Sequence, residues 1–269
     1  MKKPLRDIGT PLKAAVLANH KSVVDLLLSA GANLHQYTVT EISYLLGGGK
    51  VVDCAICETL VTHGLDINVI DPFINMNLLQ LACLRGAPGA HVQFLLDNGL
   101  QNVIGWQDSN GKPPLCLAVE SIRHKNSSDC DVLQVLSQHG AQVNPMGVDP
   151  SPLRLAVQWS SAQAVRLLLQ FGANANEVTS DWSNGLDGFA WHTSGTDEID
   201  LECDIFEALV HAGASFGPGF APNNLLERVS LVNHGRYARL IHSCIRDYDV
   251  VLKGLKRGIT LLTSLPSPS

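Results

Sequence analysis

The sequence predicts an all-α solenoid of about six to seven stacked helix-turn-helix repeats joined by finger loops. The first observation is a glycine that returns in a similar context, at successive intervals of 33, 35, 41, 32 and 41 residues. The second is a largely apolar triplet shortly before each glycine, such as Leu26–Leu28. One repeat of this size cannot bury its apolar face alone, so the repeats must stack. The glycines are Gly31, Gly64, Gly99, Gly140, Gly172 and Gly213.

Each of these glycines is expected just past the second helix of its repeat. A helix commonly ends where one residue adopts the left-handed backbone conformation, which glycine reaches without steric strain. His63, His139 and His211 stand at or near the same point of their repeats. An imidazole there can bond the last helical carbonyls and favours the helix dipole. We therefore interpret the three histidines as helix-capping residues.

Residues 10–33 resemble one whole ankyrin repeat. The segment opens with Thr-Pro-Leu-Lys, in which Lys13 takes the place of the family's histidine, and it ends with Leu-Leu-Leu-Ser-Ala-Gly-Ala. Proline suits the first helical turn, because the N–H that it lacks would be unpaired there. The resemblance implies an ankyrin-repeat solenoid over roughly residues 7–217. Related openings mark further first helices at 77–83, 113–119 and 151–157.

The repeat pattern divides the chain into three predicted parts. They are six ankyrin-like repeats at 1–217, divergent C-terminal capping helices at 218–262 and a disordered tail at 263–269. Polar insertions, expected as surface loops or helix extensions, separate the two helices of repeats four and six near 123–131 and 193–203.

Repeat two departs most clearly from the pattern. Its first helix is expected at 42–50. Lys50 and Val51 are then expected on two neighbouring columns of first-helix positions, Lys50 with Glu120 and Gln158 and Val51 with Trp159 and His192. Three glycines in this segment should each weaken the helix by about 1 kcal/mol relative to alanine.

Composition and charge narrow the classes of function. The formal net charge is −6, whereas a surface for nucleic acid or anionic membranes needs an excess of Lys and Arg. No apolar run reaches the roughly 18 residues of a membrane-spanning helix. Seven cysteines without a regular framework favour a reduced, intracellular chain. We expect a monomer in the cytoplasm, with the nucleus as an alternative, that binds neither nucleic acid nor membranes.

The resemblance implies that a partner protein meets the concave face, which is built from the finger loops and the exposed positions of the first helices. All four tryptophans fall on these elements when the family pattern is laid on the sequence. Tryptophan is enriched in binding hot spots because it offers a large, rigid surface. The alternative for each ring is that it only packs beneath the next finger. The predicted partner-binding residues are Trp106, Asp108, Lys112, Glu120, Gln158, Trp159, Asp181, Trp182, Asp187, Trp191 and His192.

Three weaker patterns are compatible with a metal or a phosphate, and we interpret each as structural. Cys54 and Cys57 have the spacing of a zinc half-site, but no second pair stands nearby, so buried cysteines are the better interpretation. The glycines before Lys50 lack the strand and the Ser or Thr of a phosphate loop. Carboxylates at 197–204, near His192, fit a solvated face or a helix start. We therefore predict no metal and no cofactor.

The sequence contains no hydrolase, metalloprotease or dinucleotide-binding motif. The first hypothesis is therefore a non-enzymatic scaffold or adaptor, whose acidic fingers choose a basic partner protein. The alternative is an enzyme or small-molecule binder with a pocket around Trp159, Trp191 and His192, in which Asp187 orients the histidine. A third hypothesis is a fragment of a larger protein. A deep pocket would favour the enzyme, and an open groove would favour the adaptor.

Overall fold

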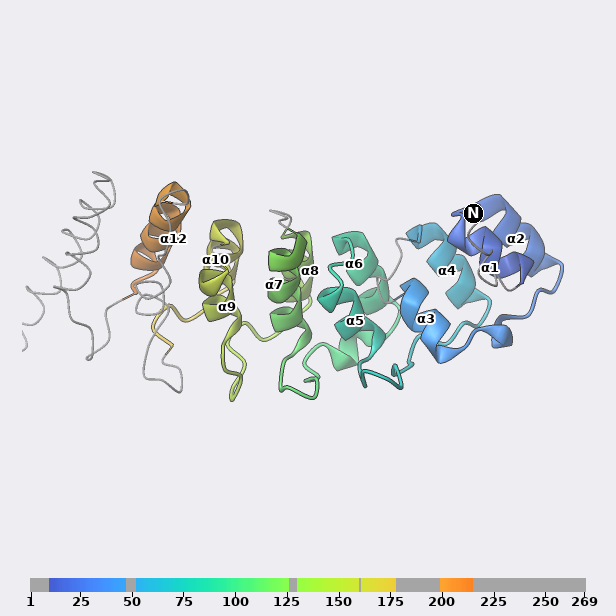
Figure 1. The fold of residues 1–269 in the computed structure, drawn as a ribbon, viewed down its shortest axis with the longest axis horizontal. Helices are drawn as coiled ribbons and strands as arrows, with labels where there is room; N and C mark the ends of the chain where they lie inside the picture. The colour runs from blue at the N-terminus through green and yellow to red at the C-terminus, as the bar shows by residue number, and fades with distance from the viewer. Residues whose placement is uncertain (1–9, 47–51, 126–129, 160, 178–198, 215–269) are drawn as a thin grey trace, which may run out of the picture. The chain divides into compact units, whose positions relative to one another are not determined.

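The computed structural model describes residues 10–46, 52–125, 130–159, 161–177 and 199–214, and these residues form helices and connecting loops (Figure 1). Within them the only strand-like pairing is an isolated antiparallel bridge between Ile70 and Asn77. The chain divides into two compact units, Met1–Leu155 and Ala156–Ser269, which we describe separately. The predicted capping helices at 218–262 and the predicted tail at 263–269 lie outside the described residues.

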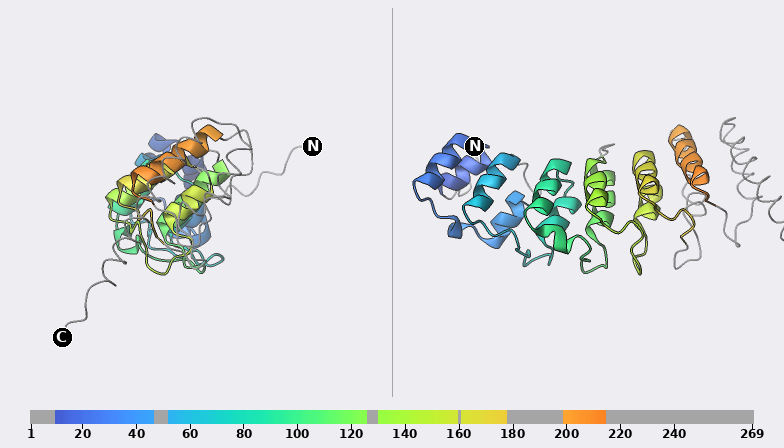
Figure 2. Two further views of the ribbon diagram at one scale, coloured as in Figure 1. Left: turned by 90° about the vertical axis from the view of Figure 1, so that its left-hand side faces the viewer. Right: turned by 180° about the vertical axis from the view of Figure 1, so that it is seen from behind.

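The first unit is built from helix pairs, which confirms the predicted all-α class and helix-turn-helix repeat. The first helices α3, α5 and α7 pack in that order, and the second helices α2, α4, α6 and α8 pack in a parallel row. The repeated pairs are also seen from behind (Figure 2). The helices are α1 (Pro11–Leu17), α2 (Lys21–Ser29), α3 (Val39–Leu46), α4 (Cys54–Thr62), α5 (Leu78–Leu84), α6 (Gly89–Asp97), α7 (Pro114–Lys125) and α8 (Asp131–Gln138), with the short 3-10 helices η1 (Leu34–Gln36) and η2 (Leu100–Val103).

Helix α9 (Pro152–Gln158) spans the boundary between the units, and the second unit continues with α10 (Ala162–Gln170) and α12 (Ile199–His211). Helices α10 and α12 pack together, with Leu168 and Phe206 buried. An ion pair of 2.8 Å joins Arg166 Nη2 to Asp204 Oδ2 on these two helices. The second unit therefore repeats the packing of neighbouring second helices seen in the first.

The six recurrent glycines end their helices as predicted. All six have a left-handed backbone, with φ between 81° and 116°. At Gly31, the glycine N–H donates to Leu28 O (2.9 Å), and the next N–H, of Ala32, donates to Leu27 O (2.9 Å). The same second bond recurs at Ala173, whose N–H donates to Leu168 O (2.9 Å). This Schellman arrangement satisfies helical carbonyls that would otherwise lack partners.

The first helices begin with side-chain caps. In α1, Thr10 Oγ1 accepts a hydrogen bond from Lys13 N (3.4 Å), and proline follows at the first helical position. In α5, Asn77 Oδ1 accepts from Gln80 N (2.9 Å), and Gln80 Oε1 accepts from Asn77 N (3.0 Å). This reciprocal capping box satisfies two backbone N–H groups at a buried helix end. Small side chains are buried on the first helices at Ala15, Ala82, Ala118 and Ala156.

Repeat two differs from the prediction, because its first helix covers 39–46 rather than 42–50. Thr38 Oγ1 accepts from Glu41 N (3.3 Å), and Glu41 Oε2 accepts from Thr38 N (2.8 Å), so a capping box starts the helix early. The helix ends before the glycines. Lys50 and Val51 thus lie beyond α3, outside the described residues.

Repeat three holds the end of this irregular helix. Arg85 Nη1 donates to Ser43 O (2.6 Å), and His91 Nε2 donates to Leu46 O (2.5 Å). His91 is 3% exposed, and burial lowers the pKa of its imidazole, so the ring is neutral near pH 7. Because Leu46 O can only accept, the proton of the neutral ring must sit on Nε2. Two side chains of repeat three therefore satisfy carbonyls at the end of α3.

Replacing Gly172 with valine is expected to lower the free energy of unfolding by about 1–2 kcal/mol, the usual cost of left-handed backbone for an L residue. Gly172 has φ +85°, and an added Cβ would meet no atom within 4 Å, so the cost is conformational and not steric. Urea unfolding measures the change. Gly105→Val is the matched control, since Gly105 has an equally open surrounding and no left-handed φ. Equal effects at the two positions would contradict the assignment of the glycine role.

Candidate partner-binding surface

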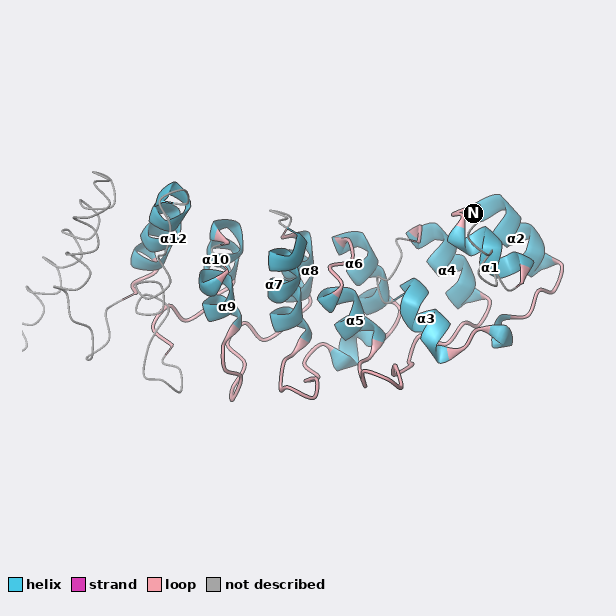
Figure 3. Ribbon diagram, viewed as in Figure 1, coloured by secondary structure: helices cyan, strands magenta, loops and turns pink. Residues whose placement is uncertain are grey.

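Three connecting loops of the first unit lie along one edge beside the first helices (Figure 3). We name them finger 3 (65–77), finger 4 (98–113) and finger 5 (141–151), after the repeats that they precede. Each presents a large apolar side chain to solvent: Phe73 is 82% exposed, Trp106 52% and Met146 93%. We call these three residues the finger-tip row. Large exposed apolar side chains on successive loops are typical of a binding surface.

The turn of finger 3 forces Phe73 outward. The buried Asp71 carboxylate accepts hydrogen bonds from the N–H groups of Phe73 (2.9 Å) and Ile74 (3.3 Å). Asn75 adopts φ 52°, and its N–H donates to Asp71 O (2.8 Å). These hydrogen bonds hold the backbone of residues 73–75 against Asp71, and the phenyl ring of Phe73 projects into solvent.

Finger 4 is built around Asp108, one of the predicted partner-binding residues. Its carboxylate is 9% exposed and accepts from the N–H groups of Asn110 (2.8 Å) and Lys112 (2.8 Å). The carbonyl of Trp106 accepts from Gln80 Nε2 (3.1 Å) on α5, so the backbone beneath the exposed indole is anchored. Asp108 therefore shapes the finger that presents Trp106, and little of its surface is open to a partner.

The structure brings two other predicted residues together. Lys112 Nζ and Glu120 Oε1 form a short ion pair between finger 4 and α7, with 27% and 20% of their side chains exposed. A related pair of 2.6 Å joins Lys13 on α1 to Glu41 on α3. These charges already have partners, so a bound protein would gain little by replacing one of them. Their main effect is to fix fingers and first helices to each other.

The remaining predicted residues belong to the second unit. Gln158 is the last residue of α9 and Trp159 follows it, and both side chains are half-buried. The other five lie outside the described residues, so the pocket around Trp159 and His192 stays a prediction. They are Asp181, Trp182, Asp187, Trp191 and His192.

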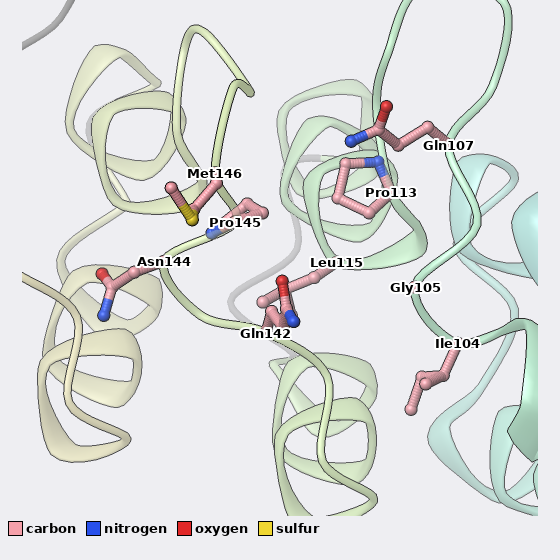
Figure 4. Close-up of a pocket in the computed structure, with 9 residues that line it drawn as sticks. All are labelled: Ile104, Gly105, Gln107, Pro113, Leu115, Gln142, Asn144, Pro145 and Met146. Atoms are coloured by element: carbon pink, nitrogen blue, oxygen red, sulfur yellow. The ribbon is translucent and has the colours of Figure 1, made fainter.

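Between fingers 4 and 5 lies a cleft of about 390 Å³ (Figure 4). Side chains of finger 5 line one side and Ile104 and Gln107 of finger 4 the other. Sequence reasoning missed both this cleft and the exposed Met146 beside it. The described residues that line it are Ile104, Gly105, Gln107, Pro113, Leu115, Gln142, Asn144, Pro145 and Met146.

The buried Cys57 and the helix-end His63 have structural roles. Cys57 is fully buried, and burial, as the largest cause, raises the pKa of its thiol to about 12, as expected for a cysteine packed in the core. His63 Nδ1 lies 2.8 Å from Thr59 O, which confirms the capping role of this histidine. Across the described ranges, no three His, Cys, Asp or Glu side chains are grouped so that they could hold a metal ion. Nor do those ranges include a helix with the length and apolar character that crossing a membrane requires.

Stacked helix pairs with glycine-ended second helices and projecting fingers define this chain as a helical-repeat protein of the solenoid class. A family model described as ankyrin repeats in three copies matches residues 50–147, and the single ankyrin repeat model matches residues 9–38 and 151–180. Together these matches cover more than half of the chain. The protein belongs to the ankyrin-repeat family.

Similar proteins support this assignment at the level of fold. Ankyrin repeat protein R599 of Acanthamoeba polyphaga mimivirus is 24% identical over 178 residues, which are 63% of this chain and 44% of the viral protein. The chain therefore spans less than half the length of that relative. The human ASB11 ankyrin repeat domain is 18% identical, with a TM-score of 0.53 over 87% of this chain and 83% of that domain. The ankyrin repeat domain of Bcl-3, an IκB-family protein, is 22% identical, with a TM-score of 0.59 over 88% and 100%.

Proposed function

We propose that the chain is a non-enzymatic interaction module, which binds a partner protein through its fingers and the first-helix face beside them. Ankyrin repeats are general protein–protein interaction modules, and the exposed finger-tip row is the observation that supports a contact on this side. When a partner binds, exposed Phe and Trp side chains bury large apolar areas in the interface. The loss of side-chain entropy is small, because these rings have few rotatable bonds. Met146 adds an adaptable apolar contact at the end of the row.

The partner's contacting surface is proposed to be basic. Fingers 3, 4 and 5 contain four aspartates, at 66, 71, 108 and 149, and one lysine, Lys112, which is paired with Glu120. This imbalance sets up a negative field over the loops. Such a field speeds encounter with a positive partner and loses that effect as salt screens it. The association rate with the partner protein is therefore expected to fall as the salt concentration rises. A rate that does not depend on salt would contradict a basic partner.

Serine replacements at Phe73 and Trp106 test the proposed surface. Each is expected to weaken partner binding by more than about 1 kcal/mol, because each removes an exposed aromatic anchor without disturbing the core. A partner is first captured from native lysate on the wild-type chain and identified by mass spectrometry, and its affinity for each variant is then measured with purified proteins.

The matched control is Leu26→Ser on α2, where an equally exposed apolar side chain, 67% exposed, lies on a second helix. Circular dichroism melting establishes that all variants remain folded. Unchanged affinity in the Phe73→Ser, Trp106→Ser double variant would refute the proposed surface. An equal loss in Leu26→Ser would show that the effect is not specific to the fingers.

A further inference from the structure

The cleft between fingers 4 and 5 is lined by both apolar and polar side chains. Three of the residues that line the cleft, Pro113, Leu115 and Pro145, are themselves buried. The cleft therefore lies against the packed part of the fold at the base of the fingers. Gln107, Gln142 and Asn144 are exposed and supply side-chain amides, which both donate and accept hydrogen bonds. An apolar depression with a few convergent polar groups has the composition of a recognition pocket.

None of the described residues that line the cleft carries a charge. Among the nearby charges of finger 4, the Asp108 carboxylate is occupied by backbone N–H groups and Lys112 is paired with Glu120. A charged group entering the cleft would lose its hydration without gaining a counter-charge, which is unfavourable. The charge character of the cleft therefore complements an uncharged occupant and disfavours a phosphate, a carboxylate or a metal ion.

We propose that this cleft binds an extended, uncharged segment of the partner protein, with one apolar side chain packed against the accessible Ile104 and Met146 side chains that line it. This inference rests on the proposed function and names the kind of segment that the fingers recognise. The backbone of an extended segment offers N–H and C=O groups on both sides, which match the donors and acceptors of the Gln107 and Gln142 side-chain amides. The exposed indole of Trp106 extends the contact beyond the cleft, and Met146, which lines the cleft, joins the cleft to the finger-tip row. Basic residues of the partner would then lie outside the cleft, over the acidic fingers.

Gly105 allows the cleft to be filled without disturbing the fold. It lines the cleft, its φ is not left-handed, and a Cβ built on it meets no atom within 4 Å. Gly105→Phe should therefore place a ring in the cleft at little cost in stability. Gly105→Ala leaves most of the volume open. Ser109→Phe adds the same ring to an exposed position of the same finger that does not line the cleft.

The experiment uses a phage-displayed library of random 12-residue peptides, selected on the full chain. Enriched peptides are expected to share an apolar residue within an uncharged core. Their Kd values, measured by fluorescence anisotropy with synthetic labelled peptides, are expected to rise at least tenfold in Gly105→Phe and to stay within twofold in Gly105→Ala and Ser109→Phe.

Three results would overturn the inference: no enriched peptide, peptides with a charged core, or peptides that bind Gly105→Phe as tightly as wild type. Failure here is separable from failure of the proposed function. If Phe73→Ser and Trp106→Ser weaken the captured partner while Gly105→Phe does not, the fingers bind a protein surface and the cleft is not its recognition site.

Discussion

Replacing Leu117 with alanine is expected to lower the free energy of unfolding by about 2–5 kcal/mol, the range observed for buried Leu-to-Ala changes. Leu117 is 1% exposed and lies on α7, which packs against both α5 of the preceding repeat and α8 of its own. The substitution removes buried contacts and leaves a cavity in the core to which α7 contributes. In a stacked array the stability of each repeat depends on its neighbours, so the loss should reach beyond repeat four.

Leu26→Ala is the matched control, because the same atoms are removed from a side chain that is 67% exposed. Its effect should stay within about 0.5 kcal/mol, as for most surface changes. Urea denaturation gives both values, and hydrogen exchange gives their distribution along the chain. Faster exchange in α5 as well as α7 and α8 is expected for Leu117→Ala. A stability unchanged by this variant would contradict the stacked core.

Replacing His91 with alanine is expected to cost about 2–4 kcal/mol, because the change combines a lost buried side chain with a carbonyl left without its donor. The Leu46 carbonyl at the end of α3 would lose its hydrogen bond of 2.5 Å. Hydrogen exchange should accelerate first in α3. Loss of stability without faster exchange in α3 would mean that the His91 bond does not hold this helix.

The pH dependence gives a second test of the same contact. Burial lowers the pKa of folded His91 below its unfolded value, so the folded state binds the proton less readily. The stabilisation is fully present above the unfolded pKa of about 6.5 and is lost as pH falls below it toward the folded pKa. The stability difference between wild type and His91→Ala should therefore shrink as the pH is lowered from 7 to 5. A constant difference over this range would contradict a buried, neutral imidazole.

The regular repeats could be predicted from sequence because their signals are local. A glycine such as Gly172 is needed wherever the helix end turns left-handed, and that need does not depend on distant residues. The start of α3 was not predicted, because no proline marks its first turn as it does in other first helices. The signal that remains is the capping pair of Thr38 and Glu41. The chain after α3 was therefore assigned to the helix, although the structure ends the helix at Leu46.

The candidate surface was only partly predictable, because exposure of a loop residue depends on three-dimensional turns. Trp106 was selected for its residue type, and the structure places it on an exposed finger. The sequence alone does not distinguish Phe73 and Met146 from apolar core residues. Their exposure to solvent becomes evident only from the turns of their fingers. In finger 3 the available signal was Asp71-Pro-Phe, since an aspartate that caps the following N–H groups commonly precedes a tight turn. Asp108 shows the converse, because its carboxylate is used inside the finger and not on its surface.

The most direct test of the account is a hydrogen-exchange footprint of the captured partner on the full chain. Fingers 3, 4 and 5 are expected to gain protection together with the adjoining starts of α5 and α7, whereas α4, α6 and α8 remain unchanged. Protection confined to those second helices, with the fingers exchanging as in the free chain, would contradict the proposed binding surface.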